Sequence, residues 1–198
     1  MVKVREDYIE DSGGEAAIDQ WLDKISKIVD FGDIEKVRRA CITSLQIEAQ
    51  SVQEDRVWAK EHNSFKIGLE MAQILIELEL DQSAIIAAIL YRAVREGKVP
   101  LETIQNDFGK ETAKLINGVM QMAAISATHR HYKGAVLGQQ QGQTDNVRKM
   151  LVTMIDDVRV VLIKLAERTC AIRAVKNASS EKRHRVAREV FDIYAPLA

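Results

Sequence analysis

Apolar residues recur along this chain every three or four positions, which is the spacing of one face of an α-helix. The first series predicts a helix from about 15 to 30 and consists of Ile18, Leu22, Ile25 and Ile28. A second helix is expected to follow Asp33, whose side chain can cap the segment IEKVRRACITSLQIEAQSV. These two helices must pack on other elements, because isolated helices of this length are marginal in water.

The middle of the chain predicts the centre of the core. A helix is expected over about 64 to 79, and Asp81 then caps a segment that is apolar around most of its circumference. Pro100 suits the first turn of a short helix, PLETIQNDF, and Gly109 precedes another through KETAKLINGVMQMAA. We expect the helix after Asp81 to lie at the centre of the core.

The last third of the chain predicts a long loop and then more helix. From Ser126 to Thr144 the sequence turns to Gly, Gln and His, which is typical of a loop. A dense apolar stripe from about 145 to 174 predicts one long helix or two nearly continuous ones. Ser179 and its neighbours can cap a final helix that runs to Tyr194. The pattern predicts an all-α fold of about nine helices in one domain, 1–198.

Composition supports helices and narrows the class of protein. The chain has two prolines, ten glycines and four phenylalanines, fewer turn and aromatic residues than all-β chains usually carry. Its 28 lysines and arginines nearly balance 29 acidic residues, which disfavours direct binding of nucleic acid. No apolar run reaches the roughly 18 residues of a membrane span. Cys41 and Cys170 show no CxxC spacing, and no secretory signal opens the chain, so we expect free thiols in the cytoplasm.

Three segments resemble the RelA/SpoT family of alarmone enzymes. They are LEMAQILIELELDQSAIIAAIL at 69–90, DNVRKMLVTMIDDVRVVLIKLAERT at 145–169 and RVAREVFDIYAPLA at 185–198. With the stretch between them, the resemblance covers about two-thirds of the chain. It implies a helical hydrolase domain of the HD superfamily, with synthetase and regulatory domains expected after 198. The opening MVKVR resembles the RelA branch, whose members make the alarmone but do not degrade it.

The resemblance also implies where a metal site belongs. In hydrolysing relatives one His, a later His-Asp pair and a distant Asp hold manganese, which acidifies water and steadies the pyrophosphate leaving group. The first His falls on Ile67, which has no lone pair to offer. The His-Asp pair falls on Tyr91 and Arg92, a phenol that stays protonated near neutral pH and a cation. The distant Asp falls on Glu167, and one carboxylate does not hold the metal.

The residues that assist attack by water are changed as well. The Glu-Asp pair of the hydrolysing relatives falls on Arg95 and Glu96, and an Asn beyond the distant Asp is replaced by Ala171. The resemblance therefore implies a degenerate hydrolase domain with no catalytic residue, no metal and no cofactor in this segment. Magnesium is expected only with the absent synthetase domain.

Arg92 and Glu167 suggest a further hypothesis. The guanidinium occupies the vacated metal position and pairs with the surviving carboxylate, because an unpaired buried carboxylate is costly. In the alternative, both side chains point to solvent. Two other patterns resemble metal ligands but are not assigned to a metal site. We interpret His129 and His131 as part of a solvated loop, and Asp156 and Asp157 as surface or helix-packing charges.

The functional expectation follows the resemblance. The parent would transfer pyrophosphate from ATP to GTP or GDP in the stringent response, and this domain would have a regulatory or structural role. A second hypothesis is a guanine-nucleotide sensor in which Arg92 and Arg95 receive phosphates without cleaving them. A third is an active HD phosphohydrolase with unrecognised ligands. The expected partners are the synthetase domain of its own chain and, through regions outside this segment, the ribosome, with no direct nucleic acid and no membrane.

Overall fold

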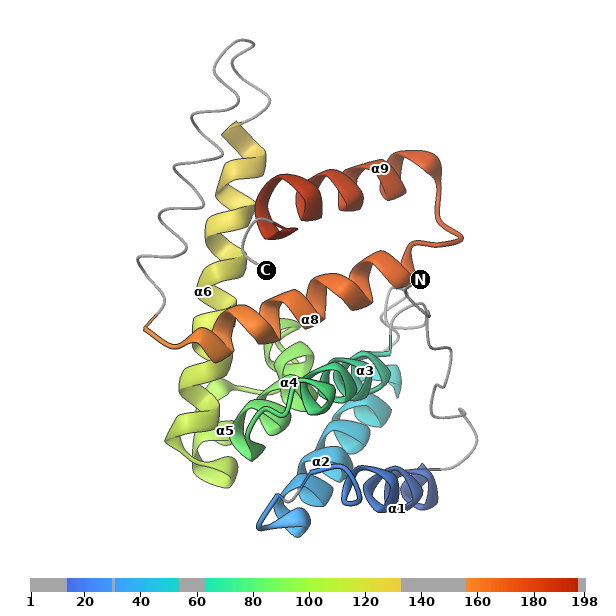
Figure 1. Ribbon diagram of the computed structural model, residues 1–198, viewed down its shortest axis with the longest axis vertical. Coiled ribbons are helices and arrows are strands. Elements are labelled where there is room, and N and C mark those ends of the chain that lie inside the picture. Colours follow the sequence, from blue (N-terminus) through green and yellow to red (C-terminus); the bar gives the residue numbers. More distant parts are fainter. Residues whose placement is uncertain (1–13, 30, 54–62, 133–155, 196–198) are drawn as a thin grey trace. The chain divides into compact units, whose positions relative to one another are not determined.

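The computed structural model describes residues 14–29, 31–53, 63–132 and 156–195 (Figure 1). These residues form eight α-helices and one five-residue π-helix and include no strand, which confirms the all-α class. None of the described helices combines the length and apolarity needed to cross a membrane. The chain divides into two compact units, 1–100 and 101–198, so its organisation as one domain stays a prediction.

The first unit contains four helices: α1 Gly14–Ile25, α2 Ile34–Gln53, α3 Ser64–Glu77 and α4 Gln82–Arg95. The expected caps are present, since carboxylates of Asp33 and Asp81 accept hydrogen bonds from backbone amides three residues later, at 3.1 and 2.9 Å. The α3 and α4 helices pack together most extensively, and α4 is buried on nearly all sides. The central helix expected from the sequence is therefore confirmed.

The close approach of α3 and α4 depends on a glycine. A Cβ added to Gly68 would overlap the carbonyl oxygen of Ile89 and lie 3.0 Å from its Cα. Glycine is used where two backbones must come this close, because every other residue would force them apart.

One boundary prediction for the first unit is wrong. The α1 helix ends at Ile25 and not near residue 30, and Ile28 is 58% exposed instead of continuing the apolar face. The Ser26 hydroxyl donates a hydrogen bond to the Asp23 carbonyl at 3.1 Å, a local bond of the kind that competes with helix continuation. The chain then turns at Gly32, whose φ of 67° is accessible to glycine.

The second unit contains α5 Leu101–Phe108, α6 Lys110–Tyr132, α8 Val158–Ala174, α9 Ser180–Glu189 and the π-helix η2 Val190–Tyr194. The predicted loop begins too early, because α6 continues from Ser126 to Tyr132, and His129 and His131 are therefore helical. Helix propensity and length outweighed the polar composition of this stretch. The rest of the predicted loop, 133–144, and the predicted helical residues 145–155 lie outside the described residues.

Candidate functional site

The positions that the resemblance assigned to a metal site lie on three helices. Within the first unit, Ile67 is half-buried on α3, whereas Tyr91, Arg92 and Arg95 lie on α4 and Glu96 caps its end. Glu167 lies in the second unit, on α8. The pairing of Arg92 with Glu167 therefore stays a prediction, and each residue is described with its neighbours in its own unit.

Arg92 forms an ion pair with Glu96. Its Nη2 donates a hydrogen bond to Glu96 Oε1 at 2.5 Å, one turn further along the helix. Both side chains are mostly buried, with 17% and 11% exposed. The Arg92 Nε is also buried and has no hydrogen-bond partner among the described residues. The guanidinium at the predicted metal position is thus already neutralised by a carboxylate from its own helix.

Lys98, just beyond the end of α4, brings a second cation close to Glu96. Gly97 has a φ of 70°, the left-handed conformation typical of a residue just beyond a helix. Gly97 and Lys98 then donate backbone hydrogen bonds to the carbonyls of Val94 and Ala93, at 3.0 and 2.9 Å. The chain therefore reverses, and Lys98 Nζ lies 3.1 Å from Glu96 Oε2.

Lys98 also contacts residues from the start of α3 and from α2. Its Nζ lies 2.7 Å from Glu48 Oε2 and donates to Ser64 Oγ at 2.7 Å. The Ser64 hydroxyl in turn donates to Glu96 Oε2 at 2.6 Å, and the Ser64 amide donates to Glu48 at 3.2 Å. The Lys98 side chain is 1% exposed. We call Glu48, Ser64, Arg92, Glu96 and Lys98 the α4 charge cluster.

The α4 charge cluster contains two carboxylates and two cations, so it is neutral overall. Burial alone raises the pKa of Glu96, but the hydrogen bond from Ser64 and the charges of Arg92 and Lys98 outweigh it and hold the pKa below its usual value. Glu96 is therefore ionised near neutral pH. Burying ions is costly, and such a cluster persists because each member is paired.

Tyr91 and Arg95 lie on another side of α4. Tyr91 is fully buried, and the Arg95 guanidinium lies 5.9 Å from the centroid of its ring. This distance is within the range of a cation–π interaction. Arg95 itself is exposed.

Glu167 is held by two cations of its own helix in the second unit. Lys164 Nζ lies 2.9 Å from Glu167 Oε2, and Arg168 Nε donates to the same oxygen at 2.7 Å. Arg168 also donates through Nη2 to the other carboxylate oxygen, which makes the contact bidentate. The Glu167 side chain is 1% exposed. The one carboxylate that survives from the predicted ligand set is thus shared between two cations.

The same two cations lie against Tyr194 at the end of η2. Lys164 Nζ and Arg168 Cζ are 5.6 and 5.7 Å from the centroid of the Tyr194 ring, which is fully buried. Arg168 also lies 3.3 Å from Glu189. Burial alone lowers the pKa of Arg168, but its bonds to Glu167 and the nearby charge of Glu189 outweigh it and raise that pKa. Lys164 and Arg168 of the segment 145–169 therefore contact Tyr194 of the segment 185–198, two of the segments that carry the resemblance.

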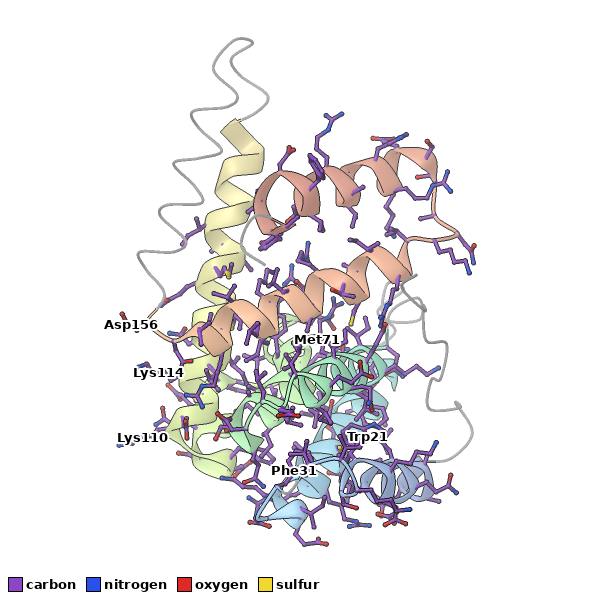
Figure 2. All side chains as sticks on the ribbon, in the orientation of Figure 1. Trp21, Phe31, Met71, Lys110, Lys114 and Asp156 are labelled. Atoms are coloured by element: carbon purple, nitrogen blue, oxygen red, sulfur yellow. The ribbon has the colours of Figure 1, made fainter. Side chains whose placement is uncertain are left out.

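A hollow of about 250 Å³ lies between α6 and the start of α8. Its lining includes Lys114 on α6 and Asp156 just before α8, both labelled in Figure 2. Asp157 caps α8 through the Arg159 amide at 3.0 Å and pairs with the Arg159 guanidinium at 2.7 Å. Asp157 therefore caps α8 and pairs with Arg159, and the interpretation of the acidic pair as surface or helix-packing charge stays a prediction.

Residues 44–198 match the family model described as "HD domain". The match covers more than half of the chain. The chain belongs to the HD domain family.

Curated relatives place this HD domain with the RelA/SpoT proteins. It is 41% identical over 130 residues to a GTP pyrophosphokinase of Myxococcus xanthus and 40% identical over 131 residues to one of Escherichia coli K12. It is 34% identical over 128 residues to the bifunctional (p)ppGpp synthase/hydrolase SpoT of Escherichia coli K12. Each match covers about two-thirds of this chain (65–66%) and only 16–17% of the relative, so the chain spans a small part of their length.

At the positions that the resemblance assigned to manganese, the side chains offer few lone pairs that are not already paired with cations. Ile67 has no donor atom, Arg92 brings a positive charge that Glu96 already neutralises, and Glu167 is paired with two cations. Divalent metals need several oxygen or nitrogen lone pairs that are not already taken by cations. Among the described residues, no three side chains of His, Cys, Asp and Glu gather closely enough to hold a metal ion.

Sequence reasoning missed most of the charged residues around these positions. Glu48, Ser64 and Lys98 were not predicted, because they are brought together from segments up to 50 residues apart. The only local signal was Gly97. A glycine just after a helix predicts that the chain reverses there, which turns the side chain of Lys98 back toward the helix. In the second unit, the KLAER string carried part of the signal, because Lys164 and Glu167 are three residues apart on one helix face, whereas the contact of Glu167 with the adjacent Arg168 does not follow from helix spacing.

Proposed function

We propose that the chain is the amino-terminal part of a cytoplasmic GTP pyrophosphokinase that makes (p)ppGpp from ATP and GTP or GDP in the stringent response. The names of the relatives from Myxococcus xanthus and Escherichia coli support this proposal. Pyrophosphate transfer, with its magnesium, would belong to the segment after Ala198. Within this account the HD domain does not hydrolyse (p)ppGpp and has a regulatory or structural role toward the synthetase domain.

The ion pair between Arg92 and Glu96 is the observation that most supports the loss of hydrolysis. Arg92 lies where hydrolysing relatives are expected to have a metal-binding carboxylate. It forms an ion pair with Glu96, the one acidic residue left in the pair that is expected to assist attack by water. Arg92 offers a Mn²⁺ ion no lone pair, and the Glu96 carboxylate that could offer one is already paired with Arg92 and Lys98. No nucleophilic water is then generated, because that step depends on the metal's charge.

Retention of the core supports a role other than catalysis. The α4 helix is fully packed and its charged end is paired, so the fold is maintained around the changed site. We infer that the domain acts by contacts with the synthetase domain of its own chain. Replacing it with an inert helical bundle in the full-length protein should disturb regulation of synthesis, and normal regulation after replacement would contradict this role.

Hydrolysis is tested by pyrophosphate release from ppGpp with excess manganese. The purified chain is compared with a hydrolysing relative, such as Escherichia coli SpoT, under the same conditions. We expect no release above the rate without protein. Release that depends on manganese and on this chain would show that the ligand alignment is wrong.

A guanine-nucleotide sensor is the second candidate, and Arg95 is the residue that favours it. Arg95 is exposed beside the Tyr91 ring, whereas the Arg92 side chain is mostly buried. A phosphate ligand would therefore be held by Arg95 first. Calorimetric titration with ppGpp of the native chain and of Arg95→Gln tests it: heat that disappears in the variant supports a sensor, and no heat in either supports a structural module.

A further inference from the structure

The helical turn that follows α9 is wider than a turn of an α-helix. The α9 helix packs on α8 (Figure 1) and continues without a break into η2. In η2 the Ala195 amide donates its hydrogen bond to the carbonyl of Val190, five residues back, where an α-helix would use Phe191. Such π-turns are rare and occur frequently at functional sites. This turn therefore needs contacts that favour it over an α-helical turn.

Arg168 on α8 contacts both ends of this turn. Its Nη1 lies 3.3 Å from Glu189 Oε1, and its Cζ lies 5.7 Å from the centroid of the Tyr194 ring. Glu189 and Tyr194 are five residues apart. In an α-helix, residues at this spacing lie about 140° apart around the axis, so they face different sides. In a π-helix they lie one turn apart on the same side, so both contacts with Arg168 depend on the π-turn.

Arg168 is itself held in one orientation by Glu167. The Glu167 carboxylate accepts hydrogen bonds from Nε and Nη2 of the guanidinium, whose planar fork then leaves Nη1 for Glu189. The side chains of Arg168, Glu167 and Glu189 are mostly buried, with 10%, 1% and 7% exposed. An ion left unpaired there would be costly, so these contacts favour the turn that keeps Glu189 and Tyr194 beside Arg168.

We propose that Arg168 is a positioning residue that selects the π-turn after α9, and that the turn becomes α-helical when Arg168 loses Glu189. The change would rotate the residues after Tyr194 by about 100° around the helix axis, the share of one residue in an α-helical turn. Glu167, which orients Arg168, lies at a position that the resemblance assigned to a metal ligand. The device therefore links this position to the direction of the chain beyond Tyr194.

Burial and a proline offer another explanation for the π-turn. Ile193 and Tyr194 are 2% and 0% exposed, and they belong to one apolar cluster with Met122 of α6. The sequence also has a proline at position 196, which disfavours a regular α-helix before it. Neither factor depends on Glu189. A variant that changes this side chain alone therefore separates both factors from the contact with Arg168.

The experiment identifies the carbonyl that accepts the hydrogen bond of the Ala195 amide. Nuclear magnetic resonance couplings across hydrogen bonds report the donor and the acceptor together. In the native chain we expect a coupling to Val190. In Glu189→Ala, which removes the carboxylate and keeps a good helix former, we expect the coupling to move to Phe191. A native chain without the Val190 coupling would overturn the proposal, and so would a variant that keeps this coupling or loses it without gaining the one to Phe191.

Glu181→Ala is the matched control, because it removes the same charge from the first turn of α9, where the side chain is exposed. It should leave the coupling at Val190. Arg168→Lys is a second test, since it keeps a cation in the buried site but has no planar fork to bind two carboxylates. It should move the coupling to Phe191, as Glu189→Ala does. A shift in Glu181→Ala, or no shift in Arg168→Lys, would overturn the role of Arg168.

The consequence for activity rests on the proposed function, in which a synthetase domain follows Ala198. In the full-length protein, Glu189→Ala should change the rate of (p)ppGpp synthesis at least about fivefold, the low end of a typical coupling between two sites, and Glu181→Ala less than about twofold. An unchanged rate in Glu189→Ala, beside a shifted hydrogen bond, would contradict the link to synthesis. A native full-length protein that makes no (p)ppGpp would contradict the proposed function, whereas the hydrogen-bond couplings test the π-turn independently.

Discussion

Arg92 and Glu96 lie one turn apart on α4, and Nη2 of the arginine is 2.5 Å from Oε1 of the glutamate. Arg92 is a cation at a predicted metal position. Glu96 is the one carboxylate left in the pair that was expected to assist attack by water. Lys98 then approaches the second oxygen of Glu96 at 3.1 Å. Arg92 and Lys98 thus neutralise Glu96 within the α4 charge cluster.

Removing the Lys98 charge should destabilise the first unit strongly. Lys98→Met leaves Glu48 and Glu96 buried with one cation fewer, a loss typically of about 3–5 kcal/mol in the free energy of unfolding. The measurement is urea unfolding followed by circular dichroism. Lys110→Met, on an exposed lysine, is the matched control and should cost less than about 0.5 kcal/mol. Equal costs would show that the cluster does not stabilise the fold.

Glu96 should make stability depend on acid pH. Its pKa is lower in the folded chain than the value of about 4.3 for an unfolded glutamate. The ionised carboxylate therefore stabilises the fold above that value, and the contribution is lost as the pH falls through the folded-state pKa. Glu96→Gln should be less stable than the native chain at pH 7, with a difference that shrinks below about pH 4. A difference that stays constant with pH would contradict this assignment.

Gly68→Ala should destabilise the packing of α3 on α4. A Cβ there would overlap the backbone of Ile89, and overpacking of this kind costs about 1–3 kcal/mol. Gly118→Ala is the matched control in another helix, because its nearest neighbours are side-chain methyl groups of Val160 and not backbone atoms. Thermal unfolding should show a clear loss for Gly68→Ala and a smaller one for Gly118→Ala. The reverse order would mean that the two helices separate easily.

Local signals predicted most helix starts and fewer helix ends. Asp33, Asp81 and Ser179 cap helices as expected, because a cap is a contact between residues two or three positions apart. The predicted end of α1 was wrong. Ile28 fits the apolar spacing, but the helix ends at Ile25 and the Ile28 side chain is exposed. The extension of α6 to Tyr132 was missed because serine, threonine and histidine do not break a helix.

The residue types at the candidate site can be read from the sequence, but the partners of those residues cannot. Residues with no metal-binding atom, such as Ile67, are visible in the sequence. The partners of Arg92 and Glu167 are not, because each could pair with any nearby ion of opposite charge. Lys98 is the clearest case, since its contact with Glu48 joins residues 50 positions apart.

Tyr194 should stabilise the second unit much more than its neighbour Phe191. Tyr194 is buried against Lys164 and Arg168, whereas Phe191 is 77% exposed in the same π-helix. Tyr194→Leu removes the ring and both cation–π contacts and should cost about 2–4 kcal/mol. Phe191→Leu should cost less than about 0.5 kcal/mol. Guanidinium unfolding measures both, and similar costs would show that the cations do not hold the ring.

Manganese affinity tests the central claim most directly. The spectrum of free Mn²⁺ is followed by electron paramagnetic resonance as the chain is added, with a hydrolysing relative measured beside it. The neutralised donor set at Arg92 and Glu167 predicts that the signal of free Mn²⁺ stays unchanged up to high protein concentration. One bound ion per chain, released again by Glu167→Gln, would contradict the loss of the metal site.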